Sequence, residues 1–360
     1  MRFYFAENGG DVRVRKLLAG VQAVLEGHGH ERVTTPGAAS VVFNPFPPDR
    51  PRSFRRQNSA VFLVGLTTLA GIDDPIAAIY PLLVRSLSNL VISITPAGDR
   101  DIADLHFVTL EQGHVQLQAD GLSSAFFEAL YARLEPLATS TLVISNIFEP
   151  NLEPELWNGD AGTRGIGRAG RYLAELNLMP AAFPIEEVLP PRELRQVKKL
   201  YGIGGLSYGN FSVRLDEERF WMSASGVDKS KLETIGRDIL LVKGYDSERN
   251  AILLSVPPHI EPRRVSVDAI EHWMIYRENP GVLAILHVHA WTDGIRSTQV
   301  TYPCGTYEMG RAVADLVRTS PDPVHTIIGL KNHGLTITGT SMDEILERVT
   351  GRLVRNVPMT

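Results

Sequence analysis

The sequence contains one cysteine, Cys304, so no disulfide bond can form within the chain. Small secreted domains that depend on several disulfides are therefore excluded, and a reducing, cytoplasmic location is expected. No histidine lies near Cys304 in the sequence, and a proline precedes it. We therefore expect a structural thiol rather than a nucleophile.

Long apolar runs and an excess of positive charge are also missing. The longest uncharged apolar stretch, Ser59–Ile72, is shorter than the run of about 18 residues that a membrane-spanning helix requires. The opening residues, MRFYFAENGGDVRVRKL, lack the apolar core of a signal peptide. The 36 basic and 41 acidic residues give a net charge of −5, with no attractive field for nucleic acid or anionic lipid. We expect neither a membrane nor a nucleic acid as a partner.

Two domains are expected. The 360 residues exceed one typical domain of about 100–200 residues, and 44% hydrophobic with 21% charged residues suits folded globular cores. Residues 1–150 have the pattern of a small α/β domain of unassigned role. Residues 151–188, rich in proline and glycine, are the expected linker, and residues 189–360 form the second domain.

Short apolar runs alternate with amphipathic stretches in both domains. In the first domain the expected strands are Arg2–Phe5, Ser40–Phe43, Ala60–Leu69, Leu90–Thr95, Asp104–Leu110, His114–Ala119 and Thr141–Ile147, and the expected helices are Val12–Glu26, Pro75–Ser88 and Ser123–Leu137. The second domain is expected to begin at a helix near Arg192. Its expected strands are Phe211–Leu215, Arg219–Met222, Ile239–Lys243, Ala251–Ser255, Val282–His289 and Thr326–Lys331, with helices Asp268–Arg277, Thr306–Thr319 and Ser341–Arg355.

Histidines end two apolar strands of the second domain. His287 and His289 lie two residues apart in GVLAILHVHA, so both imidazoles point to the same face of the strand. His333 ends another strand and is followed by Gly334, which allows a sharp turn. Three neutral imidazoles with a fourth position open to water or substrate are typical of a catalytic zinc site. A lone histidine is more often a core or surface residue, so the surrounding motifs must decide.

Five ordered motifs between Leu200 and Gly339 carry a resemblance. They are GLSYGNFSVR (Gly205–Arg214), FWMSASGVDKSKL (Phe220–Leu232), DAIEHWMIYRENPGVLAILHVHA (Asp268–Ala290), YPCGTYEMG (Tyr302–Gly310) and LKNHGLTITG (Leu330–Gly339). Together they resemble the class II aldolase/adducin family, which includes fuculose-phosphate and rhamnulose-phosphate aldolases and ribulose-phosphate 4-epimerase. The resemblance implies an α/β/α sandwich around a central, mainly antiparallel sheet.

The resemblance places His287, His289 and His333 on the family's metal-binding histidines. The implied cofactor is Zn2+ or another divalent cation such as Mn2+ or Co2+. Asp268 falls on the acidic residue that ligates the ion or acts as acid and base. Family aldolases usually carry Glu there and the 4-epimerase carries Asp, so Asp268 slightly favours an epimerase-like or otherwise altered chemistry. Asp268 is also a candidate N-cap with Glu271 at the capping-box position, and both roles stay open.

Small residues match the family's phosphate cradle, in which backbone N–H groups and hydroxyls reach an anion. These residues are Ser207, Gly209 and Asn210 in one loop, Ser225 and Gly226 in a second, and Ser266 in a third segment. Each loop alone is also a common turn. The family usually has a Ser-Ser pair at the third segment. Here Val267 replaces the second serine, which leaves phosphorylation of the substrate open.

Two departures from the family concern the pocket. The stretch between His289 and Tyr302 is shorter than usual, so the pocket is expected to be more open. The family commonly uses a C-terminal tyrosine of a neighbouring subunit as proton donor, and no tyrosine follows Tyr307. Either Tyr302, Tyr307 or a residue of the first domain replaces it, or the reaction needs no such donor, or catalysis is lost.

The resemblance thus implies a metal-dependent lyase of carbohydrate metabolism. An aldolase or epimerase would act on a small hydroxy-carbonyl substrate, a sugar or sugar-phosphate-like compound, through a metal-bound enediolate. A decarboxylase or dehydratase of the same family and a non-catalytic adducin-like scaffold are the alternatives. Family pockets lie between subunits, so a homo-oligomer is expected, with a tetramer as one option. In the first domain, the proline-rich loop with Arg50, Arg52, Arg55 and Arg56 either binds an anion or is solvated.

Overall fold

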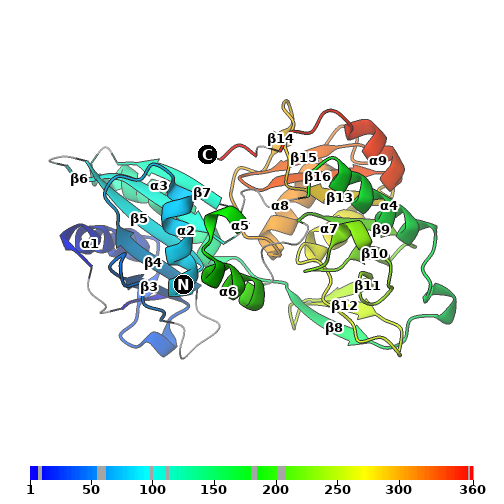
Figure 1. The fold of residues 1–360 in the computed structure, drawn as a ribbon, viewed down its shortest axis with the longest axis horizontal. Helices are drawn as coiled ribbons and strands as arrows, with labels where there is room; N and C mark the ends of the chain where they lie inside the picture. The colour runs from blue at the N-terminus through cyan, green and yellow to red at the C-terminus, as the bar shows by residue number, and fades with distance from the viewer. Residues whose placement is uncertain are drawn as a thin grey trace. The chain divides into compact units, whose positions relative to one another are not determined.

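The computed structural model describes residues 1–6, 10–54, 62–97, 100–110, 113–119, 121–179, 185–201, 208–355 and 357–359. The chain divides into two compact units, each described here by itself. The first unit comprises Met1–Thr139, Phe183–Gly204 and Met359–Thr360, and the second comprises Ser140–Ala182 and Gly205–Pro358 (Figure 1). Ser207, one of the expected cradle residues, lies outside the described residues.

The first unit is built on one mixed sheet. Its strand order is β2-β1-β3-β4-β5-β6-β7, parallel from β2 to β5 and antiparallel from β5 to β7. The strands are β1 (Arg2–Phe5), β2 (Glu31–Arg32), β3 (Val41–Pro45), β4 (Phe62–Thr68), β5 (Leu90–Ala97), β6 (Arg100–Thr109) and β7 (Gly113–Gln118). The helices are α1 (Val12–Gly27), η1 (Pro36–Ala38), α2 (Pro75–Ser86), α3 (Ser124–Thr139), α5 (Ile185–Val188) and α6 (Pro191–Tyr201).

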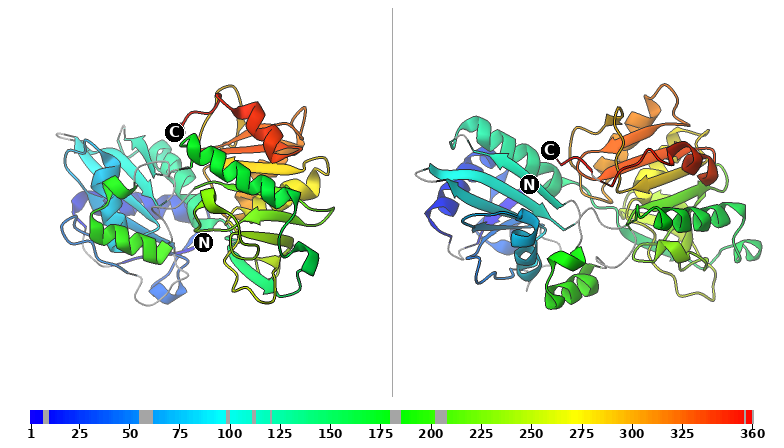
Figure 2. Two further views of the ribbon diagram at one scale, coloured as in Figure 1. Left: turned by 45° about the vertical axis from the view of Figure 1, so that its right-hand side comes forward. Right: turned by 45° about the horizontal axis from the view of Figure 1, so that its top comes forward.

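Helices cover both faces of this sheet (Figures 1 and 2). Helix α1 begins because the Asp11 carboxylate accepts hydrogen bonds from the backbone N–H groups of Arg13 and Val14. Its buried residues recur at helical spacing and pack with α3 against Phe3 and Phe43. Helix α2 packs against β5 and β6. The small α/β domain expected in the first part of the chain is therefore present.

The second unit is an α/β/α sandwich. Its sheet order is β14-β15-β16-β13-β9-β10-β11-β12-β8, and only the pairs at its two ends, β14/β15 and β12/β8, are parallel among the described strands. The strands are β8 (Ser145–Glu149), β9 (Asn210–Arg214), β10 (Phe220–Ser223), β11 (Ile239–Asp246), β12 (Ala251–Ser255), β13 (Ala284–Val288), β14 (Arg296–Ser297), β15 (Ile327–Leu330) and β16 (Gly334–Gly339). The helices are η2 (Pro154–Leu156), α4 (Ala161–Glu175), η3 (Lys229–Lys231), α7 (Ala269–Glu278), α8 (Tyr307–Arg318) and α9 (Met342–Val349). Helices α4 and α9 pack together on one face, and α7 and α8 pack together on the other, which confirms the expected sandwich.

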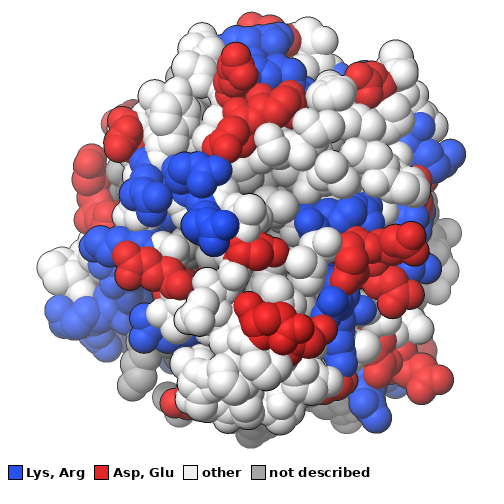
Figure 3. Space-filling model, turned by 90° about the vertical axis from the view of Figure 1, so that its right-hand side faces the viewer, with Lys and Arg blue, Asp and Glu red and all other residues white. Residues whose placement is uncertain are grey.

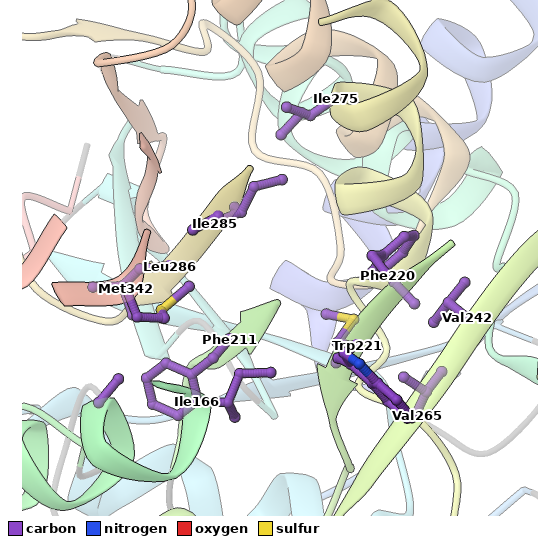
Figure 4. Close-up of a cluster of buried hydrophobic side chains, with 14 of the residues drawn as sticks. Ile166, Phe211, Phe220, Trp221, Val242, Val265, Ile275, Ile285, Leu286 and Met342 are labelled. Carbon is purple, nitrogen blue, oxygen red and sulfur yellow. The ribbon is translucent and has the colours of Figure 1, made fainter. Parts of the chain in front are cut away.

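The core of the second unit fills both sides of this sheet (Figure 4). Phe211 of β9 lies against Ile166 of α4, and Ile285 of β13 lies on the side of Ile275 of α7 (Figure 4). Trp221 is fully buried, and its indole N–H donates to the Asp160 carboxylate over 2.9 Å. Burial of one such large side chain contributes about 1.5–3 kcal/mol. The same carboxylate caps α4, so one residue ties that helix to the sheet.

The division into units differs from the expected boundaries at residues 150 and 189. Strand β8 pairs in parallel with β12, and α4 packs on β9 and β10, so most of the expected linker 151–188 lies within the second unit. Helix α6, expected to open the second domain, packs on α2 in the first unit. The glycines of residues 151–188 were the reason for expecting a linker, because each glycine destabilises a helix by about 1 kcal/mol. A Cβ at Gly170 would lie 1.9 Å from the Lys229 carbonyl oxygen, so this helix needs glycine to approach η3.

No helix in the described part of the chain is both long and apolar enough to cross a membrane. Basic and acidic side chains alternate over the face of the molecule shown in Figure 3. This mixture of signs agrees with the nearly balanced charge of the sequence.

Candidate metal centre

Two of the expected ligands extend from the most central part of the sheet. Every residue of β13 is buried, and His287 lies near its end with His289 just beyond it. Their ring centroids are 5.2 Å apart. The alternation of strand side chains thus brings both rings to one place, as expected.

His333 reaches the same place from the turn between β15 and β16. A Cβ at Gly334 would lie 2.4 Å from the Val288 carbonyl oxygen, so only glycine lets the chain pass this close to β13. The His333 ring centroid lies 4.7 Å from that of His287 and 4.8 Å from that of His289. The three rings meet although His333 is separated by more than forty residues from the others.

The spacing of the ring nitrogens fits one metal ion. One nitrogen from each histidine lies within 4.8 Å of the others, and Nε2 of His333 is 3.2 Å from Nε2 of His289. Two nitrogens bound to a tetrahedral zinc at about 2.0–2.1 Å lie roughly 3.4 Å apart. Both ring nitrogens of His287 and Nδ1 of His289 are buried without a hydrogen-bond partner among the described residues. In a neutral imidazole one ring nitrogen carries a proton and the other is an acceptor, so the unpaired acceptor of His287 fits a cation that supplies the missing partner.

Burial keeps these imidazoles neutral. His287, His333 and His289 are 1%, 5% and 9% exposed. Burial, and then the neighbouring His333, holds the pKa of His287 and of His289 well below the ordinary value of 6.5. Burial also lowers the pKa of His333, although the negative charge of Asp268 opposes the shift. Neutral imidazole is the form that binds a metal ion.

Two carboxyl groups face the same part of the sheet. Asn210, His287 and Thr336 lie side by side across β9, β13 and β16. Nδ2 of Asn210 donates to the Asp268 carboxylate over 2.8 Å, and the hydroxyl of Thr336 donates to the Glu271 carboxyl group. Because paired residues point to one face, α7 holds both carboxyl groups over the row that contains His287.

The capping role considered for Asp268 is not formed. Asp268 occupies the N-cap position of α7, but its side chain makes no capping hydrogen bond among the described residues. Its second oxygen accepts from the Gly305 N–H over 3.3 Å. Glu271 bonds to Thr336 and does not reach back to the helix start. Asp268 is therefore positioned by Asn210 and Gly305, with its charge near His333.

Several buried polar groups were missed by the sequence-based reasoning. Burial, then the charge of Asp268, raises the pKa of Glu271 to about 8. Lys229 is 4% exposed, and burial lowers its pKa to about 8 against the opposing charges of Asp268 and Asp228. Nδ1 of His272 lies 2.7 Å from the Ser212 hydroxyl. Groups with such perturbed pKa values gather at functional sites more often than elsewhere.

Cys304 also belongs to this site. Its Sγ lies 3.3 Å from Nε2 of His333, although no histidine is near it in the sequence. The expectation of a purely structural thiol overlooked this contact, because it depends on two loops that meet only in the fold. Cys304 is partly buried and immediately precedes Gly305, whose N–H holds Asp268.

The structure brings the second and third segments of the expected phosphate cradle together. Ser225 donates its backbone N–H to the Arg264 carbonyl over 2.9 Å, and Ser266 donates to the Ser223 carbonyl over 3.1 Å, so the second and third segments lie side by side. Gly209 has a φ of +79°, and a Cβ there would lie 2.5 Å from the His287 carbonyl oxygen. Gly226 also has a positive φ, at +68°. Gly209 therefore serves close packing against β13, while Asn210 bonds to Asp268.

Of the two tyrosines considered as proton donors, Tyr302 is partly buried against the core of the second unit, and Tyr307 contacts another aromatic ring. The Tyr307 ring packs 6.3 Å from that of Tyr245, at the start of α8. Tyr208 has a ring contact with the triad, and its centroid lies 5.5 Å from that of His289. Tyr208 was not among the candidates, because sequence motifs gave it no distinct role.

The fold and the site together define an α/β/α domain in which three histidines are placed so that they could hold one metal ion. Residues 194–350 match the model of the class II aldolase and adducin N-terminal domain. The second half of the chain thus carries a class II aldolase domain, as its motifs predicted.

Similarity to individual proteins is more limited. Methylthioribulose-1-phosphate dehydratase from Xanthomonas campestris pv. campestris (strain B100) is 33% identical over 88 residues, which are 24% of this chain and 35% of that protein. The chain therefore spans about a third of the length of this curated relative. L-fuculose 1-phosphate aldolase from Glaciozyma antarctica PI12 is 16% identical over 57% of this chain and 72% of its own, with a TM-score of 0.34. An aldolase II superfamily protein from Pseudomonas syringae is 18% identical over 55% and 73%, also with a TM-score of 0.34. Scores this low carry no argument about this chain.

Proposed function

We propose that the second unit is a divalent-metal-dependent lyase or epimerase that acts on a small hydroxy-carbonyl compound. The observation that carries this proposal is the convergence of His287, His289 and His333 on one point, with their nitrogens within 4.8 Å of one another. Zinc is the ion proposed, because three neutral imidazoles with one open position are typical of its catalytic sites. Mn2+ and Co2+ are the alternatives.

When bound, a divalent ion polarises substrate oxygens and stabilises negative charge on them. The chain's own residues supply the proton transfer. Asp268 is held by Asn210 and Gly305, so its carboxylate has one fixed place from which to exchange a proton. Burial around the triad excludes water, which strengthens electrostatic interactions with a bound substrate. These roles suit substrates whose reaction develops an enediolate.

The reaction type follows less directly. Aldol cleavage, dehydration and epimerisation of a hydroxy-carbonyl compound can all pass through an enediolate, so one ion and one acid-base group serve each of them. The curated relative is a dehydratase of a ketose phosphate, which supports a sugar-phosphate-like substrate. The paired segments with Ser225, Gly226 and Ser266 are proposed to hold its anionic group. Asn210 is instead proposed to position Asp268.

We further propose a homo-oligomer in the cytoplasm, with neither nucleic acid nor membrane as a partner. The near balance of charge supports the last two points. Light scattering coupled to size-exclusion chromatography would give the number of subunits. A monomer at micromolar concentration would contradict the proposed homo-oligomer.

Hydrogen exchange with the solvent tests the proposed proton transfer even though the natural substrate is not identified. The protein would be loaded with zinc and incubated in D2O with dihydroxyacetone phosphate, and proton NMR would follow deuterium entering next to the carbonyl. We expect exchange that falls at least about 100-fold in Asp268→Asn, the usual scale of acid-base catalysis. The variant should keep its zinc.

The second candidate is an adducin-like scaffold, because the family model that matches residues 194–350 covers adducins as well as aldolases. A scaffold would show no exchange in the unmodified protein with any of zinc, manganese or cobalt. Exchange that persists unchanged in Asp268→Asn would instead assign the proton transfer to another residue.

A further inference from the structure

A second pocket lies within the first unit, where the loop after β3, the end of α2 and the start of α6 meet. Its volume is about 420 Å³. This is within the range of about 300–1,000 Å³ that is usual for small-molecule sites. The lining residues are Asp49, Arg50, Pro51, Arg85, Arg192, Glu193 and Gln196.

The lining is rich in guanidinium groups. Arg85 donates to the Glu193 carboxylate over 2.8 Å, and the Glu193 side chain is only 7% exposed. Burial acts to raise the pKa of Glu193, but the Arg85 hydrogen bond and the nearby charge of Arg192 bring it below the ordinary value. Arg50 and Arg192 make no ion pair with any residue that the structure describes. With the carboxylates of Asp49 and Glu193 also in the lining, the three arginines leave one net positive charge in the pocket.

The loop that carries Arg50 is held in place. The Arg50 N–H donates to the Pro47 carbonyl over 3.0 Å, and Nδ2 of the fully buried Asn44 donates to the Arg52 carbonyl over 2.8 Å. Proline at positions 47, 48 and 51 further restricts the backbone. A loop fixed in this way loses little conformational entropy when it binds a ligand.

The opposite wall is equally anchored. Nε2 of Gln196 donates to the Val84 carbonyl over 3.1 Å, which ties α6 to α2. Arg192 lies in the first turn of α6, where the helix dipole adds positive potential. Arg50, Arg85 and Arg192 thus come from three separate elements around one pocket. Arginines that are only solvated at the surface would not need hydrogen bonds that fix the loop after β3 and helix α6 around one pocket.

We propose that this pocket of the first unit binds the phosphate group of a small phosphate monoester. A guanidinium fork donates two parallel hydrogen bonds to phosphate oxygens, and Arg50 and Arg192 offer two forks that make no ion pair among the described residues. The site lies outside the metal centre's unit, so the proposal goes beyond the proposed function and does not depend on it. It gives the first unit a ligand-binding role.

Calorimetric titration of the full chain with glycerol 3-phosphate at low ionic strength tests the proposal. Arg50→Ala and Arg192→Ala should each weaken binding about tenfold or more, the scale of one charge-assisted hydrogen bond. Glu193→Gln removes the charge that compensates Arg85, so it should tighten binding. Damage to the fold would not produce that opposite change.

Two variants serve as controls. Arg2→Ala changes another exposed arginine of the same unit that does not line the pocket, and it should bind as the unmodified protein does. His287→Ala disables the proposed metal site and should also leave this binding unchanged. Absence of binding by the unmodified protein at millimolar ligand, equal affinity in all arginine variants, or loss of binding in His287→Ala would each overturn the proposal.

Discussion

The Glu271 carboxyl group gives a prediction whose size can be worked from the structure. Glu271 is fully buried above the row of side chains that contains His287, and its pKa is raised from 4.5 to about 8. The folded state therefore keeps a proton that the unfolded state releases. The stability that this proton contributes is complete below about pH 4.5 and is lost as the pH rises through about 8.

Replacing Glu271 by Gln should remove this pH dependence. Gln imitates the protonated acid, and its amide oxygen can still accept from Thr336. One pKa unit corresponds to about 1.4 kcal/mol, so the stability of the variant relative to the unmodified protein should rise by up to about 3 kcal/mol between pH 5 and pH 8. The buried histidines have lowered pKa values, so they make the free energy of unfolding increase with pH. This contribution is the same in both proteins and cancels in the comparison.

Chemical denaturation of the metal-free protein between pH 5 and pH 8 measures this difference. The exposed Glu347 on α9 provides the matched control, because Glu347→Gln makes the same substitution without removing a buried carboxyl group. If the difference between Glu271→Gln and the unmodified protein were flat over this range, Glu271 would not hold a proton in the folded chain.

Two further predictions concern the surroundings of the triad. Gly209→Ala should destabilise the second unit by more than about 2 kcal/mol and weaken zinc binding, because the new Cβ meets the His287 carbonyl oxygen and the φ is positive. Gly226→Ala, with a similar φ but nothing within 4 Å of the new Cβ, should cost only about 1 kcal/mol and keep zinc affinity, and equal losses in both variants would contradict the argument. Zinc should slow the reaction of Cys304 with a thiol reagent, because Sγ lies 3.3 Å from Nε2 of His333. If zinc still protected Cys304 from the reagent in His333→Ala, the contact between Cys304 and the His333 ring would not be the cause of the protection.

The three histidines of the candidate site could be predicted from the sequence because the surrounding motifs select them and local rules bring them together. Strand alternation sets His287 and His289 on one face, and Gly334 allows the close turn beside His333. The sandwich followed from the motifs. Strand β16, however, was missed, because the expected strand Thr326–Lys331 covers β15 alone and no strand was expected between it and the last helix.

The rest of the site depends on contacts between distant segments. Cys304 meets His333 and Thr336 meets Glu271 only after β15, β16, α7 and the loop before α8 have packed. The unit boundaries failed for a similar reason. Local glycine content opposed a helix at α4, whereas close packing of Gly170 against η3 favours one. Tertiary contacts of this kind have no local pattern in the sequence.

Metal stoichiometry tests the central claim most directly. After chelation, reloading with zinc and extensive dialysis, elemental analysis should find about one ion per chain in the unmodified protein. His333→Ala should hold far less, whereas His325→Ala, which removes a partly exposed histidine of the same unit paired with Asp322, should hold as much as the unmodified protein. An unmodified protein without bound zinc, or a His333→Ala protein that keeps its full complement, would contradict a metal centre built from His287, His289 and His333.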